Sequence, residues 1–378
     1  MVSKKNFNCS ISLKYSTMMP ADINILCRDP IGQLKRYKEL GVRVLGYTCN
    51  YVPEELIMSA GLQPYRIPNL ESEISPLVPT FVCRFAGTVL ENIIKLKDLF
   101  SGFIFAHTCD PMWRLYDIVK KKVDKPIFIL RVPHNTEGEE SLNFFKMELL
   151  RFQDFLVKNF NVKINDDSLI ESIEACNENR RLLRELYLSN SDGRYRTRAL
   201  DRFCLTLASM WLPKKEINAR IKTLNLRGTD IRSKVRLHLS GTSIYELSLI
   251  EMLEELGCFI ASDDLCTGSR YFWDIVEEYE DKISALASRY LQKAPCPSHG
   301  PLQKRLDYID LMVNKFRDHG VLIVVQRFCD PMLYDVVHIR DMLSKKNIPT
   351  MFIDYEDLKR EMGRIKVRIE AFIESLGG

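Results

Sequence analysis

The feature that most limits the possible folds of this chain is a strand-to-helix junction that occurs twice. The tetrapeptide CDPM spans residues 109–112 and again residues 329–332, about 220 positions later. Each copy follows an apolar run, GFIFAHT or GVLIVVQRF, and precedes a segment whose apolar residues have helical spacing. Because proline suits the first turn of a helix, Cys109 and Cys329 are each predicted where a strand ends and a helix begins.

The same alternation of strands and helices extends to both sides of these junctions. In the first half, VRVLGYT leads into EELIMSAG, and PIFIL follows the first CDPM helix; KVRLHLSGTSIYELSLIEMLEELGCFIAS and MFIDYED play the same parts in the second half. Alternating strands and helices predict parallel sheets with right-handed crossovers. We therefore expect an α/β fold of two Rossmann-like lobes related by an internal repeat.

A stretch rich in Leu, Arg, Glu and Asn separates the two halves and predicts several helices, with a break at the LP that follows Trp211. The expected division is an N-terminal Rossmann-like lobe over 1–140, a helical segment over 141–232 and a C-terminal Rossmann-like lobe over 233–378.

Composition excludes several classes of protein. The 378 residues are 46% hydrophobic and 28% charged with a formal charge of +4, which is typical of a folded enzyme and too balanced for a nucleic-acid or membrane-surface protein. No apolar stretch has the length of a signal peptide core or a membrane span. We expect a cytoplasmic protein with no nucleic-acid or membrane partner.

In a reducing compartment, the eleven cysteines are read as core residues, metal ligands or redox groups rather than disulfides. The absence of any CxxC pair disfavours zinc ribbons, thioredoxin-like sites and ferredoxin-type runs. Five cysteines are interpreted as small buried hydrophobes: Cys9, Cys27, Cys176, Cys204 and Cys258.

The other six occupy turns or the ends of strands, where apolar packing does not explain a cysteine. Cys296 lies between two prolines and cannot be a central strand residue, and DDLCTGSR around Cys266 is expected to be too polar for a core. A thiolate at a helix N-terminus is also favoured by the helix dipole. The six candidate ligands are Cys49, Cys83, Cys109, Cys266, Cys296 and Cys329, three in each half of the chain.

At these residues the chain resembles the 2-hydroxyacyl-CoA dehydratase and benzoyl-CoA reductase family of iron-sulfur proteins. The resemblance rests on GYTCNYVPEELIMSAGLQPYRI, AHTCDPMWRLYDIV, SDDLCTGSRYFW and RFCDPMLYDVVHIRDMLSKKNIPTMFIDYE, and it covers nearly the whole chain. The additional Cys49, Cys266 and Cys296 make the chain most similar to the double-cubane cluster proteins. Those proteins are homodimers in which six cysteines hold two four-iron four-sulfur cubanes joined by a bridging sulfide.

The resemblance implies that the six cysteines hold an [8Fe-9S] double cubane. It also implies that Cys83, Cys109 and Cys329 are ligands of the same cubane. The internal repeat favours a rival grouping by halves, with Cys49, Cys83 and Cys109 on one cubane and the rest on the other. In either case three protein ligands leave one iron of each cubane open for sulfide, water or substrate.

The resemblance also implies an oxygen-sensitive, homodimeric reductase that receives low-potential electrons from an ATP-hydrolysing activator carrying its own four-iron cluster, and that reduces a small molecule. This chain has no GxxxxGK[ST] loop, so ATP hydrolysis is assigned to the activator. Two alternatives stay open: a dehydratase or benzoyl-CoA reductase-type subunit with a single [4Fe-4S] cluster, and a non-catalytic electron carrier.

Weaker candidates surround the cysteines. His107 and His299 are interpreted as proton donors, Glu54 and Glu55 as helix caps, and Arg84 and Arg270 as groups that either offset cluster charge or form surface ion pairs. SGTSIYE, residues 240–246, is interpreted either as a helix cap or as a contact for a small polar substrate.

Overall fold

The structure, a computed structural model, describes residues 27–69, 74–191, 197–224, 235–277 and 280–377. Cys9, which is predicted to be a core residue, lies outside these ranges.

The N-terminal lobe is built on a four-stranded parallel sheet of order β2-β1-β3-β4. Its central strands β1 and β3 are buried almost throughout, as expected for a parallel sheet covered on both faces. The elements of this part are α3 (Pro30–Glu39), β1 (Val44–Tyr47), α4 (Glu54–Ser59), β2 (Gln63–Arg66), α5 (Arg84–Leu96), the 3-10 turn η1 (Lys97–Leu99), β3 (Gly102–His107), α6 (Asp110–Lys122) and β4 (Ile127–Arg131).

The C-terminal lobe repeats this architecture with a parallel sheet of order β6-β5-β7-β8. The two sheets have the same topology when their strands are counted in chain order, so the predicted α/β fold with two repeated lobes is confirmed. The elements are β5 (Val235–Gly241), α11 (Leu247–Glu255), β6 (Cys258–Asp263), α12 (Ser269–Phe272), α13 (Lys282–Gln292), α14 (Leu302–Phe316), β7 (Gly320–Gln326), α15 (Asp330–Lys345), β8 (Thr350–Tyr355) and α16 (Leu358–Ser375).

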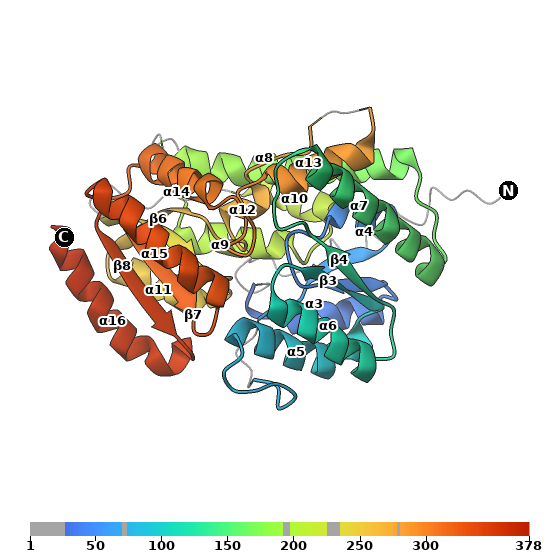
Figure 1. The fold of residues 1–378 in the computed structure, drawn as a ribbon, viewed down its shortest axis with the longest axis horizontal. Helices are drawn as coiled ribbons and strands as arrows, with labels where there is room; N and C mark the ends of the chain where they lie inside the picture. The colour runs from blue at the N-terminus through green and yellow to red at the C-terminus, as the bar shows by residue number, and fades with distance from the viewer. Residues whose placement is uncertain (1–26, 70–73, 192–196, 225–234, 278–279, 378) are drawn as a thin grey trace.

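Four helices lie between the two sheets in the chain: α7 (Glu139–Phe160), α8 (Asp166–Ser191), α9 (Ala199–Ser209) and α10 (Lys214–Thr223). The predicted break after Trp211 falls between α9 and α10. The long helix α8 packs against α4 of the first lobe and against α12 and β6 of the second, and Figure 1 shows it along the upper side of the molecule above both lobes. The helical segment therefore contacts both lobes through α8. The domain boundaries at 140 and 232 stay a prediction.

Topology decides where a ligand site can form. In each sheet the strand order reverses between two neighbouring central strands, β1 and β3 in the first lobe and β5 and β7 in the second. Open parallel sheets bind ligands beyond the carboxyl ends of the strands at such a switch point. Cys49 and Cys109 follow β1 and β3, and Ser243 and Cys329 follow β5 and β7, so both switch points carry candidate residues.

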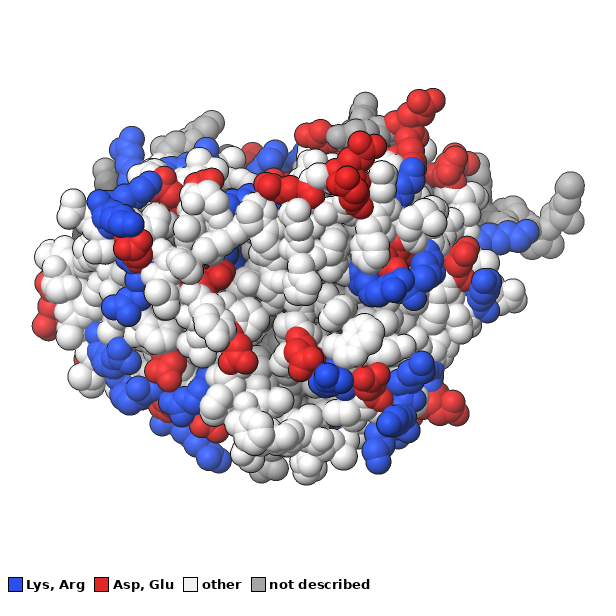
Figure 2. Space-filling model, viewed as in Figure 1, with Lys and Arg blue, Asp and Glu red and all other residues white. Residues whose placement is uncertain are grey.

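None of the helices in the described ranges is long and apolar enough to cross a membrane. On the face shown in Figure 2, positive and negative side chains are interspersed around the edge and the middle is mostly uncharged.

Candidate functional site

The six cysteines singled out in the sequence differ in burial from the others. All six are half-buried, whereas Cys27, Cys176, Cys204 and Cys258 are buried in the core. Cys258 lies in β6, and the Cys27 thiol donates a hydrogen bond to the carbonyl oxygen of Cys204 at 2.8 Å. These four therefore pack as small apolar residues.

The half-buried thiols act on one another across the two lobes. The Cys329 thiol hydrogen-bonds to Cys83, which lowers the pKa of Cys83 and raises that of Cys329. Burial raises the pKa of Cys109 to about 12, with further contributions from Cys296, Cys83 and Cys49. Burial likewise raises the pKa of Cys49 to about 11, with contributions from Cys296 and Cys266. Thiols from both halves of the chain thus lie near enough to influence one another.

Two groups can be distinguished within this site. We call Cys83, Cys109 and Cys329 the Cys83 end, and Cys49, Cys266 and Cys296 the Cys266 end. Cys296 contributes to the pKa of both Cys109 and Cys329, so the two ends are adjacent.

Helix N-termini define the Cys83 end. Cys83, Cys109 and Cys329 are the N-cap residues of α5, α6 and α15. In α6 and α15 an aspartate and a proline follow the cysteine and lysines occupy the last turn, a pattern that favours a helix beginning at this point. Phe328, which precedes Cys329, has a positive φ of 66°, a conformation that non-glycine residues rarely adopt.

Cys266 lies in a loop that Asp263 shapes. Asp263 Oδ1 accepts hydrogen bonds from the backbone N–H groups of Leu265 at 3.0 Å and Ser269 at 2.7 Å. A Cβ at Gly268 would come within 2.1 Å of the same oxygen, so the close approach requires glycine. The expectation that DDLCTGSR is too polar for a core was wrong: apart from Cys266 itself the segment is buried. Hydrogen bonds compensate Asp263 and Ser269, and an ion pair with Arg305 compensates Asp264.

Cys266 has the most polar surroundings of the six thiols. Its Sγ accepts a hydrogen bond from Arg66 Nη2 at 3.0 Å and lies 3.0 Å from Ser243 Oγ, and its carbonyl oxygen accepts one from Arg66 Nη1 at 2.7 Å. Burial raises the pKa of Cys266, but Arg66 and Arg270 outweigh it and bring the pKa down to about 7. Ser243, in the SGTSIYE segment, thus contacts a candidate ligand directly.

Two further basic side chains border the Cys266 end. Arg270 donates hydrogen bonds to the carbonyl oxygens of Asp264 and Pro295, the residue before Cys296. Lys293 Nζ donates to the backbone oxygen of Asn50 at 2.6 Å, and Asn50 Nδ2 donates to Cys266 O at 3.3 Å. Burial lowers the pKa of Lys293. The loops that carry Cys49, Cys266 and Cys296 are therefore tied together by hydrogen bonds from Arg270, Lys293 and Asn50.

Thiols act on both buried arginines of this end. In the described part of the chain neither Arg66 nor Arg270 forms an ion pair with a carboxylate, and Asp264, which also acts on Arg270, pairs with Arg305 at 2.8 Å. Burial opposes the charge of both arginines, yet Cys266 and Cys49 raise the pKa of Arg66, and Cys266, Cys296 and Asp264 raise that of Arg270. Arg202 is equally buried but is influenced by Tyr187 and carboxylates instead of thiols, and burial lowers its pKa.

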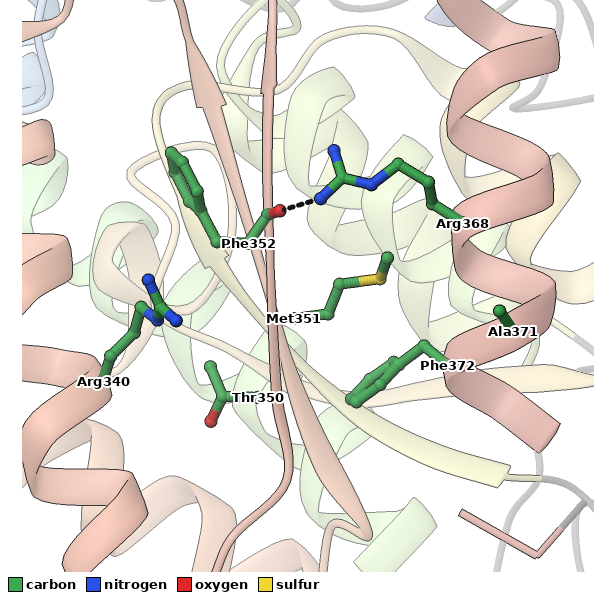
Figure 3. A pocket seen from close by; sticks show the side chains of 7 residues that line it. All are labelled: Arg340, Thr350, Met351, Phe352, Arg368, Ala371 and Phe372. Atoms are coloured by element: carbon green, nitrogen blue, oxygen red, sulfur yellow. Dashed lines mark hydrogen bonds between the residues drawn. The ribbon is translucent and has the colours of Figure 1, made fainter. Parts of the chain in front are cut away.

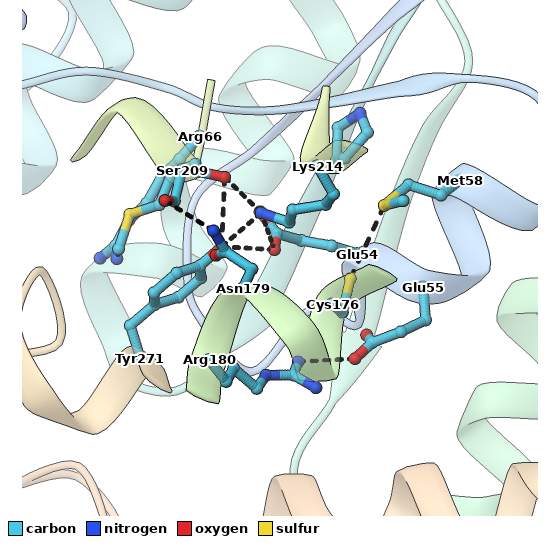
Figure 4. Close-up of polar contacts among 12 residues, drawn as sticks. Glu54, Glu55, Met58, Arg66, Cys176, Asn179, Arg180, Ser209, Lys214 and Tyr271 are labelled. Carbon is cyan, nitrogen blue, oxygen red and sulfur yellow. Dashed lines mark hydrogen bonds and ion pairs between the residues drawn. The ribbon is translucent and has the colours of Figure 1, made fainter. Parts of the chain in front are cut away.

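Glu54 and Glu55 begin α4, which follows Cys49. Their interpretation as helix caps was wrong, because their carboxylates bond to side chains of other segments. Both are buried: Glu54 accepts hydrogen bonds from Tyr47 at 2.6 Å and Tyr271 at 2.8 Å and pairs with Lys214 at 2.8 Å. Glu55 pairs with Arg180 at 2.5 Å and accepts from Tyr290 at 2.8 Å. Figure 4 shows Glu54 pointing towards Lys214 and Tyr271, and Glu55 towards Arg180. Tertiary packing of α4 against α8 makes these carboxylates structural.

His107 and His299, the two candidate proton donors, occupy different surroundings. Burial and the neighbouring His134 lower the pKa of His299 to about 3, and its ring lies 4.9 Å from the Tyr51 ring, centroid to centroid. His107 packs on Trp113 at 4.6 Å, and burial lowers its pKa as well. Both imidazoles are therefore held neutral. Their part in proton donation stays a prediction.

Arg84 and Arg270, treated alike in the sequence, differ in the structure. Arg84 pairs with Asp357 at 3.6 Å, and both side chains are partly exposed. Arg270 is buried beside Cys266 and Cys296.

Sequence reasoning missed three residues that contact the cysteine loops: Arg66, Lys293 and Asn50. Arg66 ends β2, and no local pattern marked it, because its partner Cys266 lies 200 residues away.

Among the described residues, no three His, Cys, Asp or Glu side chains are close enough together to hold a single metal ion. The donor set nevertheless suits an iron-sulfur cluster, which is bound by thiolates and has a net negative charge that buried guanidinium groups balance.

One hollow lies elsewhere on the C-terminal lobe. It has a volume of about 470 Å³ and lies over β8, between α15 and α16 (Figure 3). Thr350, at the amino end of β8, and Arg368 are among its lining residues, with Arg368 donating to Phe352 O at 2.9 Å. The hollow is thus at the opposite end of the sheet from Cys329 and is not part of the cysteine site.

Comparison with known proteins places the chain among enzymes. Residues 49–376 match the family described as 2-hydroxyglutaryl-CoA dehydratase, D-component. The (R)-phenyllactyl-CoA dehydratase beta subunit of Clostridium sporogenes is 25% identical over 352 residues, covering 91% of this chain and 94% of the relative. A benzoyl-CoA reductase subunit of Thauera aromatica is 25% identical over 350 residues, with coverages of 88% and 91%. Lactoyl-CoA dehydratase subunit beta of Anaerotignum propionicum is 25% identical over 365 residues, with coverages of 92% and 96%.

Proposed function

Because the chain belongs to the 2-hydroxyglutaryl-CoA dehydratase D-component family, we propose that it is an iron-sulfur reductase whose six half-buried cysteines hold a double-cubane [8Fe-9S] cluster. In this proposal the protein receives low-potential electrons from a separate ATP-hydrolysing activator and reduces a small molecule. Two copies of the chain form the active homodimer.

The observation that carries the proposal is the electrostatic match between Arg66, Arg270 and the Cys266 end. A buried guanidinium group without a carboxylate partner is strongly unfavourable unless another anion lies beside it. Arg66 Nη2 points at Cys266 Sγ, 3.0 Å away, and thiols raise the pKa of both arginines, with Asp264 also acting on Arg270. An anionic group bound by these cysteines satisfies the arginines, and a single cluster at the Cys83 end does not.

The contacts also favour one grouping of the ligands. Cys83 and Cys329 come from different lobes and hydrogen-bond to each other, which supports their ligation of the same cubane. Cys49 is influenced by Cys296 and Cys266, and Arg66 is influenced by both Cys266 and Cys49. We therefore assign one cubane to the Cys83 end and the other to the Cys266 end, rather than one to each half of the chain.

The chain's own residues have distinct tasks in this site. When bound, the cluster supplies one-electron reduction at low potential. Helix N-termini orient the Cys83 end, while Arg66 and Ser243 hold Cys266 in place through its sulfur. His299 lies beside Tyr51, whose hydroxyl accepts a hydrogen bond from the backbone N–H of Cys296 at 3.3 Å. We propose His107 and His299 as groups that pass protons to substrate.

Iron and sulfide counts on anaerobically reconstituted protein test the proposal. We expect about eight irons per chain in the wild type, falling to about four in Cys296→Ala, with loss of activator- and ATP-dependent reduction. Cys258→Ala is the matched control, because Cys258 is buried in β6. We expect this variant to bind as much iron as the wild type. Full iron and full activity in Cys296→Ala would contradict the double cubane.

A second candidate function rests on the relatives, which are subunits of CoA-thioester dehydratases and of benzoyl-CoA reductase. As such a subunit, the chain would hold one [4Fe-4S] cluster through Cys83, Cys109 and Cys329 and would act with an unlike partner subunit on a CoA thioester. Four irons per chain in the wild type support this reading. A pure electron carrier is distinguished by the absence of any turnover with activator and ATP.

A further inference from the structure

The two ends of the cysteine site differ sharply in the charge that surrounds them. Three basic side chains border the Cys266 end, and all three are buried: Arg66 is 1% exposed, Lys293 2% and Arg270 4%. This difference in charge affects which end of the bound cluster holds an added electron.

Arg66 is the basic residue that reaches a ligand atom. It comes from the last position of β2 in the first lobe and donates to both the sulfur and the carbonyl oxygen of Cys266 in the second lobe. A charged donor on a ligand sulfur withdraws electron density from the metal and stabilises its reduced form.

Arg270 adds positive charge near Cys266 and Cys296 without contacting a thiol sulfur. Burial lowers the pKa of Lys293, so the positive charge of this end rests on Arg66 and Arg270, and Lys293 serves as a hydrogen-bond donor to Asn50. The electrostatic effect of the two arginines is strong because both are buried, where the effective dielectric constant is low.

The Cys83 end lacks such groups in the described part of the chain. Its thiols are surrounded by backbone N–H groups of the helix N-termini, such as those of Phe85, Ala86 and Met332. The charged neighbour of Cys83 that influences it is Asp330, which is negative. Arg84, the residue after Cys83, pairs with Asp357 instead.

We propose that Arg66 and Arg270 make the Cys266 end the stronger electron acceptor of the two, so that an electron added to the site is held there rather than at the Cys83 end. The inference rests on the proposed double cubane. One electron is taken up from a low-potential iron-sulfur protein, and no bond to the chain is made or broken. Arg66 acts as a positioning and charge-tuning residue, since it reaches the metal only through Cys266.

A potentiometric titration followed by electron paramagnetic resonance tests the proposal. Wild type, Arg66→Gln and Arg66→Lys are each reconstituted anaerobically, counted for iron and then titrated. Arg66→Gln keeps a neutral donor but removes the charge, and we expect its first reduction to become about tenfold less favourable, which is about 59 mV lower for a one-electron couple. Arg66→Lys retains the charge and is expected to restore most of the wild-type potential.

Arg84→Gln is the matched control at the other end, because its charge is already compensated by Asp357. We expect it to leave the first potential unchanged. An equal shift in Arg84→Gln and Arg66→Gln, or no shift in Arg66→Gln, would overturn the proposal.

The iron count separates this failure from failure of the proposed function. Eight irons with no shift refute the charge asymmetry alone. Four irons in the wild type refute the double cubane and, with it, the existence of two ends to compare. If Arg66→Gln fails to retain iron, the same titration on Arg270→Gln, which removes the other buried positive charge near Cys266, is expected to give a shift in the same direction. No shift there would also count against the proposal.

Discussion

The Cys83 end and the Cys266 end are adjacent and contain three thiols each, but they are built by different means. At the Cys83 end, three helices begin at the three cysteines, so the local chain itself supplies the N–H groups and the helix dipoles. At the Cys266 end, buried side chains from distant segments converge: Arg66 and Asn50 reach Cys266 across 200 and 216 residues of sequence, and Lys293 reaches Asn50 across 243. The first end is set by secondary structure and the second by tertiary packing.

This difference predicts that the Cys266 end is the more vulnerable to single substitutions in the surrounding core. Glu55 links α4, which follows Cys49, to Arg180 of α8 and to Tyr290 of α13, which precedes Lys293. Glu55→Gln leaves Arg180 buried without its partner, and we expect a loss of about 3–5 kcal/mol in the free energy of unfolding. Anaerobic urea unfolding of the apoprotein measures it.

Glu171→Gln is the control for this experiment, because Glu171 forms an exposed pair with Lys215. Its effect is expected within about 1 kcal/mol. Similar losses in the two variants would show that the buried pair does not support this side of the molecule.

A second prediction compares the apoprotein with the loaded protein. In the loaded protein Arg66→Gln removes a charged hydrogen bond to a thiolate ligand, and we expect a loss of roughly 1.5–3 kcal/mol. In the apoprotein at pH 6 Cys266 is protonated, because its pKa is about 7, and the buried Arg66 then has no anion beside it. The same substitution should therefore be much less destabilising, or stabilising, in the apoprotein.

Anaerobic thermal unfolding of both forms checks this sign difference. A loss of the same size with and without the cluster would mean that Arg66 has a packing role only, and the contrast between the two ends would be weakened.

The smallest predicted effect concerns the thiols themselves in the apoprotein. The pKa of Cys266 is lowered to about 7 and that of Cys109 is raised to about 12, so at pH 8 the first is mostly thiolate and the second is not. Both are half-buried, and we expect Cys266 to be alkylated by iodoacetamide at least about tenfold faster. Mass spectrometry of the two peptides measures the rates.

The sign of the accompanying pH dependence follows from the lowered pKa of Cys266. The ionised thiol stabilises the folded apoprotein above its ordinary pKa, and this contribution is lost as the pH falls through about 7. Arg66→Gln should move the alkylation profile of Cys266 to higher pH, whereas equal profiles would show that Arg66 does not act on the thiol.

The Cys83 end shows how far local sequence reasoning can reach. The apolar run before each cysteine, the helical spacing after it and the proline two residues after Cys109 and Cys329 are local signals, and they correctly predicted a cysteine at each strand-to-helix junction. The repeated lobes were predictable for the same reason, since strand and helix periodicity are read within short windows.

The Cys266 end shows where such reasoning stops. Glu54 and Glu55 carried the local signal of helix caps, and only the packing of α8 and α10 against α4 turns them into buried ion pairs. DDLCTGSR looked too polar to be buried, because its partners, such as Tyr187 and Arg305, lie far away in the sequence.

By itself the sequence determined the two α/β lobes, the helical segment between them and the placing of Cys109 and Cys329 at the carboxyl ends of strands, since each depends on neighbouring residues. Only the tertiary structure decided that Cys83 meets Cys329 and that Arg66 meets Cys266. Those contacts join the two lobes, and their geometry depends on how both sheets pack against the same helices. A charge that is buried in one lobe and balanced by a thiol from the other has no signature in either local sequence.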